Sequence, residues 1–242
     1  MKVNFRVTLF IIITILCFNN IAKAQMFSVN SEQPVRLDLP ANSILVGYEP
    51  TSFKYTGDDT EQNLSFSDPI YRLRAELSGF EGYLAIGYNL GDANSTNLVN
   101  AGAKIDGEFR FLGDRNYFIG VPLVLGTDYL QVSTQSDENR SDDFRQSSAM
   151  VGAGLSLGFR FANRFRIESK AVPFYGFSVT SFGATGGSRV SFTNQNRIYM
   201  DRIFDRIGLT AGFDFKTARY NMDDERFDYD INSNSFVIGV TF

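Results

Sequence analysis

The sequence predicts an all-β fold, an antiparallel up-and-down β-barrel with ten strands, or with eight strands as the alternative. Three observations predict it. Apolar and polar residues alternate with a period of two along most of the chain, which separates the two faces of a strand but scatters residues around a helix. Several alternating runs exceed the five or six residues of an average globular strand. After the first 24 residues, no apolar run approaches the ~20 residues of a membrane-spanning helix.

The first 24 residues predict a secretory signal peptide. A basic start is followed by an apolar run over 9–17 and by a small-x-small cleavage site that ends at Ala24. The apolar run is too short to span a bilayer, which takes about 20 residues. We therefore expect cleavage near Ala24 during export. The expected organisation is a signal peptide over 1–24, a periplasmic N-terminal segment over 25–40 and the barrel over 41–242.

The composition excludes several chemistries. The 242 residues include no His, no Trp and a single cysteine, Cys17, which lies in the predicted signal peptide. Without His or a mature Cys, no Ser-His-Asp triad, Cys-His dyad, thiolate zinc site or imidazole base can form. Processing removes three of the 23 basic residues and none of the 27 acidic ones, so the mature chain is acidic. We expect no nucleic-acid partner, no cofactor and no metal site.

The alternation divides the chain into strands. It is clearest over 99–111, where apolar side chains occupy one face and charged or amide side chains the other. Short connections at 113–116 and 162–164 place one end of the barrel in the periplasm, and the long polar connection 133–145 lies outside. Both termini are then periplasmic. The expected strands are 42–56, 68–79, 82–91, 97–112, 116–132, 146–161, 164–181, 187–196, 205–219 and 229–242.

Two parts of this assignment leave alternatives open. Pro50 lies inside the first strand, and residues 196–205 can also form a short periplasmic helix, because Met200, Ile203 and Phe204 share one helical face. Omitting both doubtful strands gives eight strands, but it places short connections outside and long ones inside. A soluble two-sheet sandwich also explains the alternation, because one face of each sheet packs in the core and the other meets water.

The C-terminal run carries a resemblance. The chain ends in Phe236-x-Ile238-x-Val240-x-Phe242, an alternating run that an aromatic residue closes. With the predicted export signal and the antiparallel meander, it resembles the small outer-membrane β-barrel proteins of Gram-negative bacteria. The resemblance implies a transmembrane barrel in the outer membrane, surrounded by lipid and lipopolysaccharide. It also implies that the barrel-insertion machinery reads the terminal strand as an assembly signal.

By the same alternation, eight basic and five acidic side chains face the inside of the barrel. The interior of such a barrel is just wide enough for side chains to fill, and an unpaired charge there costs several kcal/mol. We expect a salt-bridged network that locks the barrel. The alternative is a narrow pore, for which the basic excess predicts a weak preference for anions. The predicted lumen network comprises Arg72, Arg74, Glu76, Lys104, Asp106, Glu108, Arg110, Arg160, Arg166, Glu168, Lys170, Asp214 and Lys216.

The predicted outer connections are acidic. Their clusters at 58–61, 137–143 and 223–230 lack the spacing of an EF-hand or an RTX-type calcium repeat. We expect solvated loops, or carboxylates that divalent ions bridge to lipopolysaccharide phosphates. Three phenylalanines also lie in the predicted outer connections: Phe66, Phe144 and Phe227. An adhesive role for them would require that their rings face the solvent.

The sequence predicts a protein that is not an enzyme. Known outer-membrane barrel enzymes generally resemble one another in relying on a His, which this chain lacks. Asp106 and Glu108 lie among Arg and Lys side chains, an environment that favours the carboxylate and not a general acid. The expected role is structural or a surface interaction. A narrow passive pore and a soluble periplasmic β-sandwich are the alternatives.

Overall fold

A computed structural model describes most of the predicted barrel. The expectations for residues 1–24 and 25–40 lie outside the described residues. Within the described part, no helix is long and apolar enough to cross a membrane. The described residues are 42–56, 65–88, 95–114, 116–135, 141–162, 164–180, 186–204, 206–222 and 228–242.

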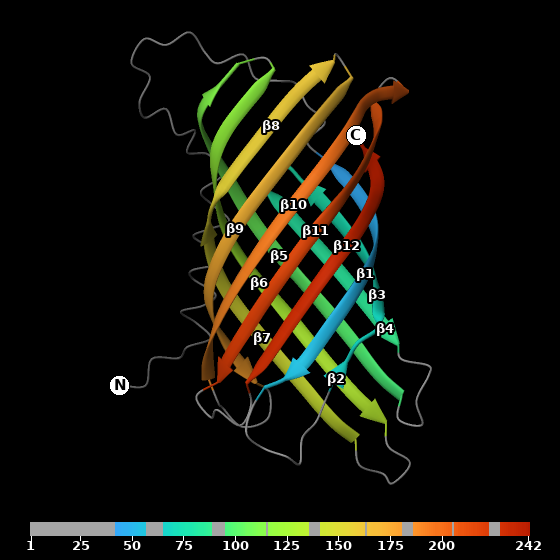
Figure 1. The fold of residues 1–242 in the computed structure, drawn as a ribbon, viewed down its shortest axis with the longest axis vertical. Coiled ribbons are helices and arrows are strands. Elements are labelled where there is room, and N and C mark those ends of the chain that lie inside the picture. Colours follow the sequence, from blue (N-terminus) through green and yellow to red (C-terminus); the bar gives the residue numbers. More distant parts are fainter. Residues whose placement is uncertain are drawn as a thin grey trace, which may run out of the picture. The chain divides into compact units, whose positions relative to one another are not determined.

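The described residues form one antiparallel sheet that closes on itself (Figure 1). The β2 segment keeps the register of β3 against β1, and β8 keeps the register of β7, so twelve segments make ten barrel strands. The barrel closes where β1 pairs with β12. The segments are β1 (Ser43–Tyr55), β2 (Ser65–Phe66), β3 (Pro69–Leu77), β4 (Phe80–Tyr88), β5 (Ser95–Gly113), β6 (Tyr117–Gln135), β7 (Ser141–Ala153), β8 (Leu155–Ala162), β9 (Phe165–Thr180), β10 (Gly186–Phe204), β11 (Ile207–Met222) and β12 (Tyr229–Thr241).

This architecture confirms the ten-strand prediction over the eight-strand alternative and over the two-sheet sandwich. The first strand forms despite Pro50, which lies opposite Pro69 of β3. Proline has no N–H to donate to a ladder, and the pairing of β1 with β12 skips residues 49 and 50. The connection predicted at 133–145 is shorter than expected, because β6 extends to Gln135 and β7 begins at Ser141.

The helix considered for residues 196–205 is wrong over its described part. Strand β10 continues to Phe204 and pairs with β9 and β11 through Met200. A bulge follows between Met200 and Phe204, where Arg202 adopts a positive φ of 56°. Between these two pairs β10 has two more residues than β11, so the alternation of faces is kept and Met200 and Phe204 both stay exposed on the outer face. The helix-like spacing of Met200, Ile203 and Phe204 does not correspond to a helix here.

The boundary between β7 and β8 is a local interruption of one strand at Gly154. Gly154 donates its N–H to the carbonyl of Pro122 on β6 at 3.2 Å, but Pro122 has no N–H to return a bond. On the other side, a Cβ at Gly154 would lie 1.9 Å from the carbonyl oxygen of Ala171. Only glycine fits so close an approach of two backbones.

The two ends of the barrel differ in their connections. Turns of two residues join β3 to β4, β8 to β9 and β10 to β11, and Gly79 supplies the positive φ of 76° in the first. The ends of β1 and β12 lie at this same turn end, at the top of Figure 1, where Phe242 donates its N–H to the carbonyl of Asn42 at 3.0 Å. Longer connections join the strands at the other end, the loop end.

The outer face of the barrel is apolar. Large side chains on every strand point away from the interior and stay exposed, among them Leu73, Phe109, Leu155 and Ile238. In water such a large apolar surface would promote aggregation, whereas in a bilayer it matches the hydrocarbon of the lipid. The predicted terminal run shares this face, with Phe236, Ile238, Val240 and Phe242 all exposed.

Candidate functional site in the barrel interior

The central part of the interior holds a network of ion pairs from five strands. Arg74 of β3 lies 2.8 Å from Asp214 of β11 and 3.3 Å from Glu76. Arg197 of β10 donates two hydrogen bonds to the same Asp214, and Lys104 of β5 lies 2.9 Å from Glu81 of β4. Five of the six side chains are at most 12% exposed, and Glu76 is 24% exposed. Such pairing compensates the cost of removing charges from water.

Three interactions cross the barrel from one side to the other. Gln195 of β10 donates a hydrogen bond to Glu81 of β4 at 3.3 Å, and these two strands lie on opposite sides of the sheet order. Arg189 of β10 pairs with Asp128 of β6, and Lys170 of β9 pairs with Asp106 of β5. These contacts fill the space between the walls at several levels.

Two further pairs lie between the network and the loop end. Asp128 also lies 3.7 Å from Lys216, so that one carboxylate serves two cations. Arg189 covers the Tyr220 ring at 5.0 Å from its centroid. Arg72 lies 2.9 Å from Glu49 and 4.7 Å from the ring of Tyr83. Buried cations over aromatic rings gain about 2 kcal/mol when desolvated.

Toward the turn end most of the ion pairs are more open to water, although Arg166 and Asp201 are each only 5% exposed. Arg166 lies 3.0 Å from Asp201 and donates to Glu168. Arg160 reaches the same Asp201 at 4.0 Å, and Glu108 accepts from Arg110. The guanidinium of Arg110 stacks on Phe118 at 3.9 Å.

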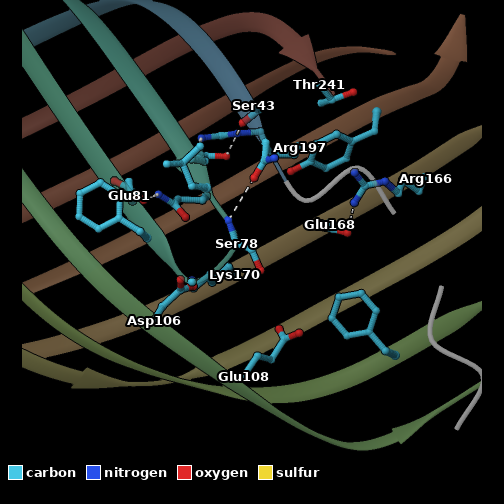
Figure 2. A pocket seen from close by; sticks show the side chains of 18 of the residues that line it. Ser43, Ser78, Glu81, Asp106, Glu108, Arg166, Glu168, Lys170, Arg197 and Thr241 are labelled. Atoms are coloured by element: carbon cyan, nitrogen blue, oxygen red, sulfur yellow. Dashed lines mark hydrogen bonds and ion pairs between the residues drawn. The ribbon is translucent and has the colours of Figure 1, made fainter. Parts of the chain in front are cut away.

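A cavity of about 500 Å³ lies at the turn end, lined by Glu108, Arg110, Arg166 and Glu168 among other residues. Figure 2 shows Glu81, Asp106, Lys170 and Glu168 around it, with Ser43 and Thr241 near the ends of β1 and β12. Its charged groups already pair with one another, so the cavity is a polar vestibule. Further in, two smaller spaces among the described residues hold about 20 and 10 Å³, which is room for one water molecule each.

An apolar cluster closes the interior at the loop end. Phe144 of β7 reaches across to Phe53 of β1 and Tyr229 of β12, with ring centroids 5.4 and 4.2 Å apart. Phe53 and Tyr229 stack at 4.8 Å. We call this cluster the aromatic plug; its buried members are Phe53, Phe66, Ile70, Ala85, Leu98, Leu130, Val132, Phe144, Ala218, Tyr220, Tyr229 and Ile231.

The position of the aromatic plug shows that two aromatic residues considered for an adhesive role are not exposed. Phe66 and Phe144, which an adhesive role would need exposed, are buried inside the barrel. The strands extend further at the loop end than the sequence indicated, and inward positions there carry apolar side chains. Phe227 lies outside the described residues.

The structure places each of the thirteen sequence-predicted charged residues within 4.0 Å of an opposite charge. Sequence reasoning missed five of their partners and also Arg189, which pairs with one of these five, Asp128. Glu81 and Asp128 follow the alternation of their strands and could have been found from it. Arg197 and Asp201 lay in the stretch of uncertain fold, and Pro50 obscured Glu49. The six missed residues are Glu49, Glu81, Asp128, Arg189, Arg197 and Asp201.

The missed residues change the charge balance of the interior. They add four acidic and two basic groups, so the ion-paired interior of the described barrel has ten basic and nine acidic side chains. The basic excess behind the predicted anion preference is therefore almost gone. Among the described residues, no group of three or more His, Cys, Asp or Glu side chains could hold a metal ion.

Comparison with known proteins identifies the class of fold. The sequence matches no protein-family model and no curated protein sequence. Among solved structures, the barrel is similar to the outer membrane protease OmpT of Escherichia coli, with a TM-score of 0.50 at 9% identity, over 83% of this chain and 95% of that one. Ail, the attachment invasion locus protein of Yersinia pestis, aligns with a TM-score of 0.32 at 9% identity over the same shares.

The fold is thus that of the Gram-negative outer-membrane β-barrels. At 9% identity the likeness concerns the fold alone. The resemblance inferred from the terminal run and the alternation is confirmed at the level of architecture.

Proposed function

We propose that this chain is a non-enzymatic, non-conducting barrel of the outer membrane, with a structural or surface-interaction role. The closed interior carries the proposal. A pore needs a continuous polar path, whereas here the ion-pair network and the aromatic plug both lie across the axis. The apolar outer face of the strands supports the membrane location.

The packed interior suits a rigid anchor. Charges on opposite strands hold the walls at fixed separations, because breaking one buried pair leaves a costly lone charge. The acidic connections at the loop end would then be displayed outside the cell, near lipopolysaccharide and divalent ions. The terminal residues Phe236, Ile238, Val240 and Phe242 would serve the insertion machinery during assembly.

The absence of catalysis is part of the proposal. The chain has no His, and the interior carboxylates all have cationic partners in the described barrel. A general acid or base instead needs a group that can change protonation near the operating pH.

A narrow passive pore is the second candidate, and the vestibule at the turn end favours it. Conductance distinguishes the two. The mature chain is refolded, a heat-modifiability gel verifies the folded barrel, and the protein is inserted into a planar bilayer. We expect no steady channels. Regular, salt-dependent single-channel steps from the folded protein would overturn the closed-barrel proposal and establish the pore.

A variant with a smaller plug makes the negative result informative. Phe144→Ala removes the ring that reaches across the interior, and Phe111→Ala removes an exposed ring from the outer face at the turn end. We expect neither variant to conduct, because the buried ion-pair network still lies across the axis when the plug is reduced. Steady conductance from Phe144→Ala alone would show that the plug, and not the network, closes the interior.

A further inference from the structure

Three polar side chains lie on the outer face of the barrel, on two adjacent strands. They are Ser169 of β9 and Asn194 and Asn196 of β10, and we call them the amide patch. Their sequence neighbours Lys170, Gln195 and Arg197 line the interior. Because side chains alternate along a strand, the amide patch points outward. Figure 1 shows β9, β10 and β11 side by side on one wall of the barrel.

The amide patch lies within the apolar band and not at its edge. Along β10, exposed apolar residues lie on both sides of it, with Val190 toward the loop end and Ile198 toward the turn end. On β9, Ile167 and Tyr175 are exposed on the two sides of Ser169. Polar side chains at this depth are expensive, and they mark functional positions in membrane proteins.

The hydrogen bonds of the amide patch form a chain from Ser169 through Asn196 to Asn194, and the last amide in the chain has no acceptor for its N–H groups among the described residues. The Ser169 hydroxyl donates to Asn196 Oδ1 at 2.8 Å, and Asn196 Nδ2 donates to Asn194 Oδ1. Asn194 Nδ2 carries two hydrogens, for which the described part of the chain supplies no acceptor. A lipid tail supplies none either, and an unmet polar group in an apolar medium costs several kcal/mol.

We infer that the amide patch is the contact between two copies of this chain in the membrane. The inference rests on the proposed membrane location. All copies insert in the same direction, so a twofold axis between them runs along the bilayer normal and identical residues meet at identical depth. A residue that faces its own copy must offer both donor and acceptor. Amides do so, whereas identical charges would repel each other.

The surroundings of the amide patch allow a close approach. Ala171 lies opposite Asn194 in the pairing of β9 with β10, and Ala211 lies opposite Ile198 in the pairing of β10 with β11. Small residues let membrane-embedded elements come near enough for side chains to bond. The second copy would supply an acceptor for Asn194 Nδ2 and would remove both amides from lipid.

Self-association of the full mature chain tests the inference. The protein is refolded in density-matched detergent micelles and its mass is measured by sedimentation equilibrium. We expect a dimer, and we expect Asn194→Leu with Asn196→Leu to weaken it about tenfold or more, as the loss of interhelical amide bonds does in model membrane peptides. Leucine suits the lipid face, so this variant should still fold.

A matched control uses other outward polar residues. Asn97→Leu with Thr127→Leu changes an amide and a hydroxyl on β5 and β6, away from the amide patch, and should leave the dimer intact. Cross-linking gives a second readout, since the predicted mature chain has no cysteine. Ala171→Cys should form a disulfide-linked dimer in vesicles, and Thr127→Cys should not.

The outcomes separate the inference from the proposed function. A folded, membrane-inserted monomer, or an amide-patch variant that associates as tightly as the unmodified chain, would refute the dimer and leave the proposed location intact. A chain that stays out of vesicles while correctly folded would refute the membrane location, and the dimer with it.

Discussion

The buried pair Arg189–Asp128 gives the sharpest test of the interior network. Each side chain is only 1% exposed, and Asp128 is the acidic partner of both Arg189 and Lys216. Asp128→Asn removes the negative charge but keeps the shape. Two cations then remain inside the barrel without their acid. Breaking a buried pair on one side costs about 3–5 kcal/mol, so we expect the free energy of unfolding to fall by about that much.

Replacing both partners of the pair shows whether the loss of stability comes from the unpaired charge or from a change in side-chain shape. Replacing both partners, Asp128→Leu with Arg189→Met, removes the lone charge, and such replacements are often neutral or stabilising. We expect this variant to recover most of the loss. Urea-induced unfolding and refolding of the mature protein in lipid vesicles measures each free energy.

An exposed pair of the same type supplies the control. Arg219 donates to Asp230 at 3.1 Å, but Arg219 is 67% exposed. Water screens such a pair, so Asp230→Asn should leave the unfolding curve unchanged. A loss below about 1 kcal/mol for Asp128→Asn, or a double variant as unstable as the single one, would refute the view that buried pairing holds the walls.

Two further predictions concern the outer face and the terminal strand. Leu155→Arg places a charge on the lipid face and should cost about 2–4 kcal/mol near the bilayer midplane, which would block assembly in vesicles. Gln195→Arg, facing the vestibule beside Glu81, should assemble normally. Equal assembly of the two Arg variants would contradict the assigned faces. Deleting Phe242 should lower the yield of assembled barrel in the outer membrane, measured by surface labelling, and an unchanged yield would argue against the terminal strand as an assembly signal.

The sequence by itself determined the walls of this protein. Period-2 alternation is a local property, so it separated the lipid-facing positions such as Leu155 from the interior positions such as Arg74 before any pairing was known. Connection lengths then ordered the strands into ten and placed the short turns at one end. Local deviations misled this reasoning in a few places: residues 196–205 around the Arg202 bulge suggested a helix, Pro50 obscured Glu49, and the ends of the strands at the loop end were placed too early.

Only the tertiary structure decided what fills the interior. Glu81 meets Gln195 across 114 residues of sequence, and Phe144 meets Phe53 and Tyr229 from the opposite wall. These contacts depend on the register of every strand and on the closure of β1 against β12. Alternation tells which way a side chain points, but only the closed barrel determines which side chain it meets there, because partners on opposite walls are set by the curvature of the whole sheet.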